Sequence, residues 1–216
     1  MLTRSRAAVL AVAALTLAAC GNVHPGDAAV VDGRSISMQQ LDDATEVYCL
    51  DHLGQASSQG AGEPVSNLDL RRAAAVGLVS VQVARTLAAE EDITVEPSAY
   101  EVPDGDRSNV AKAFPGVDVD TAIQVIEDSR ENVAIAVALA AKLTGQQQTD
   151  ENAAQLAQAG QAAIMESFRS HDVTFAPRLG LSPAGTTRAG TGTLSVSPVD
   201  VEAPAAADLP DTQRCS

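Results

Sequence analysis

The sequence predicts a mainly α-helical fold, a helical bundle with a small β element. Three long segments, 66–91, 118–143 and 149–168, carry apolar residues at helical spacing, which is typical of amphipathic helices that pack on one another. Near the N-terminus an Asp-Gly dipeptide separates two short extended segments, and this dipeptide is a strong signal for a hairpin turn. The length suits one domain with a core of ordinary size.

The predicted hairpin occupies 28–36 and turns at Asp32. Ser37 and Gln40 follow it with the spacing of a capping box, in which each side chain accepts a hydrogen bond from the other residue's backbone N–H. Apolar residues then recur at helical spacing. We therefore expect the first helix at about 38–53.

The segment 66–91 is apolar on two faces, which predicts a helix buried at the centre of the bundle. Residues 102–117 are polar and interrupted by proline and glycine, so no regular element is expected there. Asp118 or Asp120 caps the next long helix. Its last part, 133–143, is apolar nearly all round and too short to span a bilayer, which predicts burial inside the protein.

The final predicted helix is amphipathic and begins after a cap at Thr149 or Asp150. The chain then becomes extended at 173–175. From 182 to 216 it consists largely of glycine, threonine, serine, alanine and proline, so this tail is expected to lack a packed core. Residues 194–196 offer one further strand.

The first nineteen residues have the pattern of a bacterial lipoprotein signal peptide. Arg4 and Arg6 form a positive start, an apolar run follows, and Leu17-Ala18-Ala19-Cys20 matches the lipobox. In that motif the cysteine thiol receives a diacylglyceryl group and its amine is often acylated, and two or more chains anchor a protein stably. We expect cleavage after residue 19, lipidation of Cys20, a tether at 20–26 and a location on the extracytoplasmic face of the cell membrane. An ordinary secretory peptide with an incidental cysteine is the alternative.

The net charge argues against nucleic acid as a partner. Loss of Arg4 and Arg6 with the leader lowers the formal charge from −14 to −16. Nucleic-acid binding draws most of its affinity from lysine and arginine that neutralise phosphates. Aromatic residues make up 2% of the chain, so stacking platforms for single-stranded nucleic acid are scarce as well.

Two cysteines remain after Cys20, namely Cys49 and Cys215. Two is the number needed for one disulfide, and an exported protein lies in a compartment where disulfides persist. A bridge across so long a loop would stabilise the fold by about 5 kcal/mol in the chain-entropy model. Two unpaired thiols are the alternative.

The sequence contains no recognisable catalytic motif. The histidines His24, His52 and His171 are scattered, and no His, Cys or acidic residues fall at the spacing of metal ligands. Paired acids such as Glu90 and Glu91 lie at helix surfaces, where a solvated charge is the simpler interpretation than a general acid. We therefore expect neither enzymatic activity, nor a metal, nor a cofactor.

Three stretches of the chain carry a recognisable pattern. They read Ala28-Ala-Val-Val-Asp-Gly-Arg-Ser-Ile-Ser-Met-Gln-Gln-Leu41, Ala88-Ala-Glu-Glu-Asp-Ile-Thr-Val-Glu-Pro97 and Val173-Thr-Phe-Ala-Pro-Arg-Leu-Gly-Leu181. Together they resemble the N-terminal domain of SurA/PrsA-type extracytoplasmic chaperones, where a similar strand and turn precede the first helix and an isoleucine-threonine-valine turn follows a long one. The third stretch resembles the closing strand of lipoproteins in that group. Asp32 replaces the family's asparagine, a change that a tight turn tolerates.

The resemblance implies a helical chaperone-like domain at 27–181. Its first and last strands, at about 28–36 and 173–179, would pair, and an apolar surface between helices would receive unfolded polypeptide. Related chaperones often carry a parvulin-type prolyl isomerase domain, and the longest non-helical insert here, 101–118, is too short to be one. Isomerase activity is therefore not expected.

The leading hypothesis is a membrane-anchored, chaperone-like module that binds unfolded or exported polypeptide without covalent chemistry. The alternative is a subunit that docks on one fixed envelope protein, or an accessory to an enzyme of envelope biogenesis. A solute-binding lipoprotein fits less well, because such proteins are usually larger, two-lobed and rich in strands.

Overall fold

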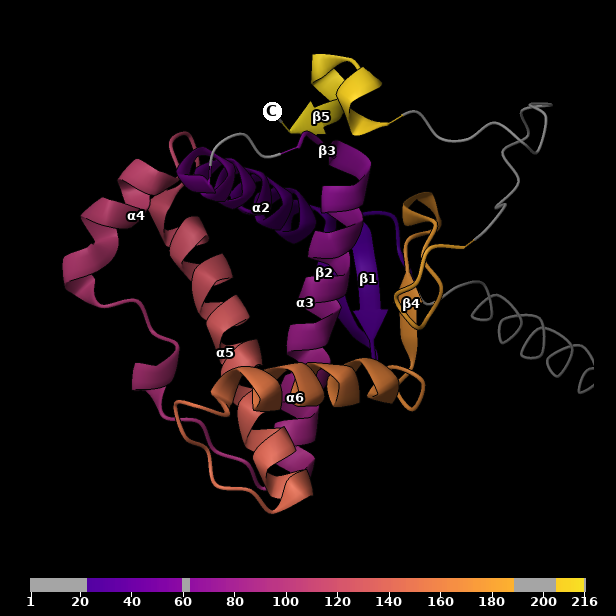
Figure 1. Ribbon diagram of the computed structural model, residues 1–216. Coiled ribbons are helices and arrows are strands. Elements are labelled where there is room, and N and C mark those ends of the chain that lie inside the picture. The colour runs from indigo at the N-terminus through magenta and orange to yellow at the C-terminus, as the bar shows by residue number, and fades with distance from the viewer. Residues whose placement is uncertain (1–22, 60–62, 189–204, 216) are drawn as a thin grey trace, which may run out of the picture.

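The computed structural model describes residues 23–59, 63–188 and 205–215. Within them, the helices α2 to α6 and a small antiparallel sheet confirm the mainly α fold (Figure 1). The predicted signal peptide with Cys20, and the strand suggested at 194–196, lie outside the described residues.

The predicted hairpin is confirmed. Strand β1 (Asp27–Val31) pairs antiparallel with β2 (Arg34–Ser37). The two residues between them have positive φ, 48° at Asp32 and 78° at Gly33. A two-residue turn of this hand matches the twist of the strands, and aspartate followed by glycine is the pair that adopts it most readily.

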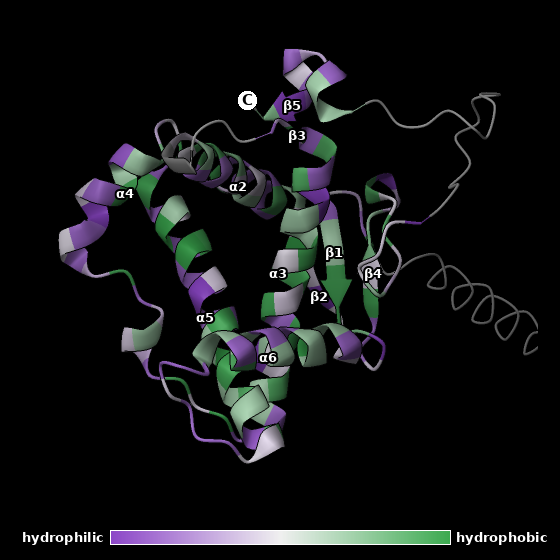
Figure 2. Ribbon diagram, viewed as in Figure 1, coloured by the Kyte–Doolittle hydropathy of each residue, from purple (hydrophilic) through white to green (hydrophobic). Residues whose placement is uncertain are grey.

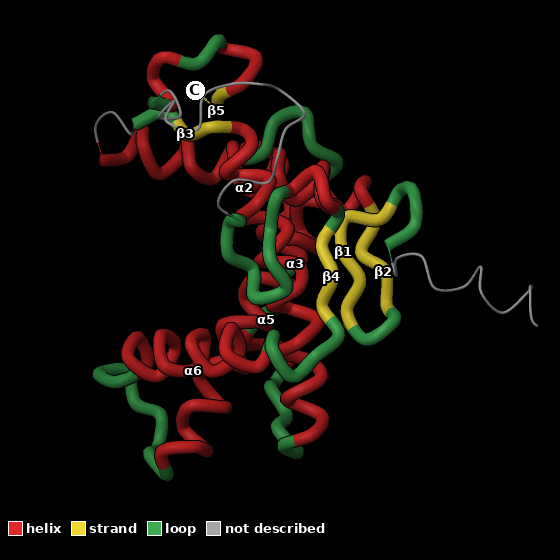
Figure 3. The backbone as a smooth tube through the Cα atoms, turned by 90° about the vertical axis from the view of Figure 1, so that its right-hand side faces the viewer, coloured by secondary structure: helices red, strands yellow, loops and turns green. Residues whose placement is uncertain are grey.

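The first and last strands of the domain also pair, as the resemblance implied. β4 (Val173–Phe175) lies antiparallel to β1, with Ala29 opposite Phe175, so the sheet order is β2-β1-β4 (Figure 3). The strand does not extend to residue 179 as expected. Pro177 cannot donate to a sheet hydrogen bond and instead starts the 3₁₀ turn η4 (Pro177–Leu179).

Helix α2 (Met38–Gln59) starts at the predicted capping box. The backbone N–H of Ser37 donates to Oε1 of Gln40 at 2.8 Å, and the N–H of Gln40 donates to Oγ of Ser37 at 3.1 Å. The helix is longer than the predicted 38–53. Of its added residues, Gly54, Gln55 and Ser57 are exposed, and the helix continues through them because polar composition alone does not stop a helix.

Helix α3 (Asn67–Glu90) is central, as its two apolar faces predicted. Ser66 caps it by accepting a hydrogen bond from the N–H of Leu68, and the helix packs on α2, α5, α6 and β1. Among the described helices, only α3 is long and apolar enough to cross a membrane by length and composition. Its apolar character is accounted for by core packing, because these residues are buried: Leu70, Ala74, Ala75, Val79, Val81, Val83, Ala84 and Ala88.

A further helix, α4 (Arg107–Ala113), lies in the stretch 102–117 where no regular element was expected. It buries only Val110, so it has too few apolar positions to show a helical period. Val110 packs with Val47 and Ile123, which joins α4 to α2 and α5.

Helix α5 (Val119–Thr144) is capped by Asp118, whose side chain accepts a hydrogen bond from the N–H of Thr121 at 3.0 Å. The helix ends at Gly145, which has a left-handed conformation with φ of 66°. Of the two capping residues left open by the sequence, the structure therefore selects Asp118.

Helix α6 (Ala153–Ser167) runs across α5 (Figures 1 and 3). Neither Thr149 nor Asp150 is its N-cap, which corrects the expectation; Asn152 holds that position. The Asn152 side chain does not cap the helix. Its amide donates to the carbonyl of Gln147, and its oxygen accepts from the N–H of Thr149, so it holds the preceding turn instead.

The main core lies where α3, α5 and α6 meet the sheet. In Figure 2 apolar residues gather along α5 and β1, while α4 is largely hydrophilic. The largest fully buried side chains are Phe168, Leu41, Ile164, Leu179, Val31, Val79 and Val83.

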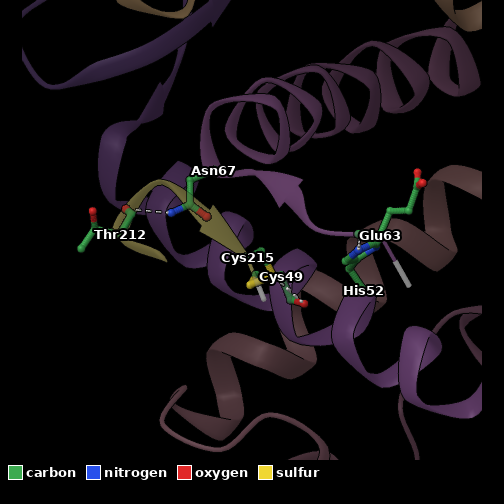
Figure 4. The surroundings of a disulfide bond; sticks show 6 residues. All are labelled: Cys49, His52, Glu63, Asn67, Thr212 and Cys215. Carbon is green, nitrogen blue, oxygen red and sulfur yellow. Dashed lines mark hydrogen bonds between the residues drawn. A yellow bond between two sulfur atoms is a disulfide. The ribbon is translucent and has the colours of Figure 1, made fainter. Parts of the chain in front are cut away.

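The end of the C-terminal tail is packed, although the composition of 182–216 predicted no core there. The turns η5 (Ala206–Asp208) and η6 (Asp211–Gln213) lead into β5 (Arg214–Cys215), which pairs with β3 (Val65–Ser66). The reason for the difference is a covalent constraint. Cys215 is joined to Cys49 of α2 by a disulfide and is only 2% exposed (Figure 4).

Candidate functional site

A cavity lies between α5, the start of α6 and the segment 94–99. Its volume is about 700 Å³, which is within the usual range of ligand pockets. We call it the main pocket. Its lining is mostly apolar and comprises Thr94, Val95, Glu96, Ala99, Ser129, Arg130, Val133, Ala134, Val137, Ala138, Gln148, Ala153, Ala154 and Ala157.

Small side chains create this space. Ala134 and Ala138 of α5, and Ala153 and Ala157 near the start of α6, all line the pocket. Each of these side chains is a single methyl group, so together they fill little of the space between the two helices. Val133 stands among them and is 44% exposed, although the sequence predicted that 133–143 would be buried. Leu143 is also exposed, at 64%. By contrast, Ile135, Ala136, Val137, Leu139 and Ala140 are buried as predicted.

The third wall, 94–99, is fixed at both ends. The N–H of Ile93 donates to the carbonyl of Ala88 at 2.8 Å, and Lys142 of α5 forms an ion pair with Glu91 at 3.0 Å. At the other end Pro97 begins the 3₁₀ turn η2 (Pro97–Ala99), which packs on α5. These contacts anchor the segment to α3 and α5.

Helix α6 approaches α5 closely enough to close the pocket because Gly160 lies at their crossing. A Cβ atom built on Gly160 would lie 1.9 Å from the carbonyl oxygen of Ala136. Only glycine therefore permits this approach of the two backbones. The position of the pocket wall depends on that contact.

A smaller cavity of about 230 Å³ lies on the same side of α5, against α2 and α4. We call it the second pocket. Val47, Tyr48, Phe114 and Ile126 supply most of its apolar lining, and Ser129 and Arg130 line both pockets. Burial raises the pKa of the Tyr48 hydroxyl, and the carboxylates of Asp128 and Asp51 add to this effect, so the hydroxyl is neutral at physiological pH. The two pockets adjoin one another along α5.

Arg130 is the cation of this surface. Its side chain is exposed, and within 23–59, 63–188 and 205–215 it forms no ion pair or hydrogen bond. Neighbouring carboxylates are already engaged: Arg85 binds Asp128 at 2.6 Å and Glu131 at 2.5 Å. Partial burial of Arg85 opposes its charge, but these hydrogen bonds outweigh that effect and raise the pKa of its guanidinium.

The three histidines do not come together. His24 lies before β1, and His52 on α2 is within 3.1 Å of the carbonyl of Glu63 (Figure 4). His171 lies 2.7 Å from Asp32, whose carboxylate also accepts the backbone N–H of Asp172. That N–H and His171 hold the pKa of Asp32 below its usual value, and the contacts join the β1–β2 turn to the loop before β4.

In the described part of the chain, no metal-binding cluster accompanies the pockets. Among the described residues no three histidine, cysteine, aspartate or glutamate side chains are placed to hold a metal ion. The paired acids near helix surfaces form ordinary contacts, such as Asp42 with Arg71 and Glu91 with Lys142. The chemistry that this lining offers is burial of apolar groups, with Arg130 and Glu96 as charges at its edges.

The disulfide fixes the C-terminal segment to the other end of the fold. Cys49 and Cys215, the pair expected from the cysteine count, have Cα atoms 5.7 Å apart. The amide of Asn67 donates to the carbonyl of Thr212 beside it (Figure 4). Comparisons with family models, curated proteins and solved structures found no match to this chain.

Proposed function

We propose that the protein is a membrane-anchored extracytoplasmic lipoprotein that binds polypeptide non-covalently, as a chaperone-like module without isomerase activity. The main pocket is the observation that carries the proposal. It is about 700 Å³ in volume and lined chiefly by alanine and valine. Such a lining gains binding energy from apolar side chains, at about 25 cal/mol for each Å² removed from water.

A polypeptide suits this surface better than a compact small molecule. The apolar lining continues from the main pocket past Ser129 and Arg130 into the second pocket. A chain with apolar side chains at intervals can occupy both pockets at once. The resemblance to SurA/PrsA-type chaperones supports the same function, since it implies a helical surface for unfolded polypeptide.

The proposed anchor would hold the domain close to the membrane. Val23 packs against the main core, and the N–H of His24 donates to Asp27 to form a turn. Cys20 precedes Val23 by three residues, which span at most about 11 Å when extended. A lipid on Cys20 would therefore keep the domain within a short distance of the bilayer surface.

The test uses the mature chain with Cys20→Ser, which avoids lipidation. It should slow the aggregation of an unfolded client at near-stoichiometric ratios, and it should leave proline isomerisation in a peptide at its uncatalysed rate, tens of seconds or slower. Acceleration of that exchange would contradict the absence of isomerase activity. Failure to slow aggregation of any client, with one stoichiometric envelope protein co-purifying, would favour the docking alternative.

A matched pair of variants tests the pocket itself. Val133 and Leu68 are both 44% exposed, but only Val133 lines the main pocket. Val133→Gln should weaken protection of the client several-fold, because it places an amide in the apolar wall. Leu68→Gln should leave protection unchanged. Equal effects of the two substitutions would exclude this pocket as the binding site.

A further inference from the structure

The two pockets are spaced along α5 at a distance that an extended chain can match. Ile126 lies in the second pocket, and Val133 and Val137 lie in the main pocket. At 1.5 Å per residue these positions are separated by about 10 to 16 Å along the helix axis. An extended chain covers that distance in about three to five residues.

The charged residues that line the two pockets alternate in sign from one pocket to the other. Arg130 lies where the pockets meet, Glu96 lies in the main pocket, and Asp51 lies in the second pocket. A carboxylate on a ligand is therefore attracted at the middle of the surface and repelled toward either end.

Arg130 is available for such a carboxylate because its acidic neighbours are used elsewhere. Asp128 and Glu131 bind Arg85, and Glu127 accepts the N–H of Val102 at 2.8 Å. The guanidinium of Arg130 has no partner within the described part of the chain. Five N–H groups thus face solvent between two apolar cavities.

We propose that the occupant is an extended polypeptide segment with apolar residues at positions i and i+4 and an acidic residue at i+2. Side chains at these three positions share one face of an extended chain. The apolar pair enters the two pockets, and the acidic side chain meets Arg130. This inference rests on the proposed function and names the class of segment that the same surface selects.

The experiment measures binding of fluorescent peptides to the mature chain with Cys20→Ser. One peptide contains Leu-Ser-Asp-Ser-Leu, and its isomer of identical composition contains Leu-Asp-Ser-Ser-Leu, which keeps the two leucines at i and i+4 and moves the aspartate to the opposite face of the extended chain. The first should bind about two- to fivefold more tightly at low ionic strength, as expected for one exposed ion pair. The difference should shrink at high salt, because exposed charges are screened.

Charge reversal provides the sharper result. Arg130→Glu should invert the preference, so that Leu-Ser-Lys-Ser-Leu binds more tightly than Leu-Ser-Asp-Ser-Leu, and Arg130→Gln should abolish the preference. Arg178 is another exposed arginine without an ion pair among the described residues, and it lines neither pocket. Arg178→Glu should keep the original preference.

The outcomes separate this inference from the proposed function. Equal affinity for the two isomers, unchanged by Arg130→Glu, would overturn the inference while leaving polypeptide binding intact. Preference for the isomer with aspartate at i+1 would overturn it as well. Failure of every peptide to bind would contradict the proposed function, and the inference with it.

Discussion

Gly160 provides the most direct perturbation of the architecture that forms the main pocket. A methyl group at this position would lie 1.9 Å from the carbonyl oxygen, 2.4 Å from the carbonyl carbon and 2.7 Å from the Cα of Ala136. All three atoms belong to the backbone of α5, so no side-chain rotation relieves the overlap. Gly160→Ala must therefore push α6 away from α5.

Two opposing effects set the size of the change. Alanine favours a helix over glycine by about 1 kcal/mol. Overpacking of a core costs about 1 to 3 kcal/mol, and a clash with helix backbone belongs at the upper end of that range. The net expectation is destabilisation by about 2 kcal/mol, or a Tm lower by about 4 to 8 °C for a chain of this size.

The same substitution at Gly54 is the control. Gly54 lies within α2, where an added Cβ would meet nothing within 4 Å. Gly54→Ala should therefore raise stability by about 0.5 to 1 kcal/mol. Thermal unfolding followed by circular dichroism measures both variants. A Tm for Gly160→Ala equal to or above that of the unchanged protein would refute the close crossing of α5 and α6.

Three further predictions concern the turn, the disulfide and the anchor. Hydrogen bonds from the backbone N–H of Asp172 and from His171 lower the pKa of Asp32 in the folded state, so they stabilise the fold above about pH 4, and this contribution disappears as the pH falls through the folded pKa. Asp32→Asn should therefore make the free energy of unfolding less dependent on pH in that acidic range. An unchanged pH profile would contradict the lowered pKa of Asp32. Replacing Cys49 and Cys215 by alanine should lower the free energy of unfolding, measured by chemical denaturation, by about 2 to 5 kcal/mol, since the disulfide closes a loop of 166 residues. It should also increase hydrogen exchange at 205–215. Free thiols at these two cysteines in non-reducing peptide maps would disprove the disulfide. The intact mass of the protein from native membranes should include diacylglycerol on Cys20, and a water-soluble product that begins at another residue would exclude lipidation.

The order and type of the main elements were predictable from local patterns. Asp32-Gly33 indicated the hairpin, the Ser37 and Gln40 capping box indicated the start of α2, and the apolar faces of 66–91 indicated a central helix. Element ends were less predictable, because they depend on tertiary contacts. At α6, Asn152 holds the N-cap position in place of Thr149 or Asp150, and its side chain holds the preceding turn rather than the helix.

The C-terminal segment shows where composition misleads. Residues 205–215 have the makeup of a loose tail, yet a disulfide and a two-residue strand pairing hold Arg214 and Cys215 against the fold. The cysteine count contained that information, whereas the density of proline and alanine did not. The disulfide between Cys49 and Cys215 holds the segment on the fold although the segment has few apolar side chains to bury.

The candidate site was only partly predictable. The resemblance implies an apolar surface between helices, but the apolar run 133–143 by itself predicts a wholly buried segment that includes Val133. Which side of an all-apolar helix stays uncovered depends on its neighbours, here α6 and the segment 94–99. Arg130 had no distinguishing signal in the sequence, because its lack of a partner follows from Arg85 binding both Asp128 and Glu131.

Site-specific photo-crosslinking tests the central claim of polypeptide binding most directly. A benzoylphenylalanine at position 133 or 68 of the lipidated protein would report contact with one defined unfolded client, at two sites whose native side chains are both 44% exposed. Binding in the main pocket predicts crosslinks from position 133, competed away by the unlabelled client, and none above background from position 68. Equal crosslinking at the two positions, or none at 133, would contradict it.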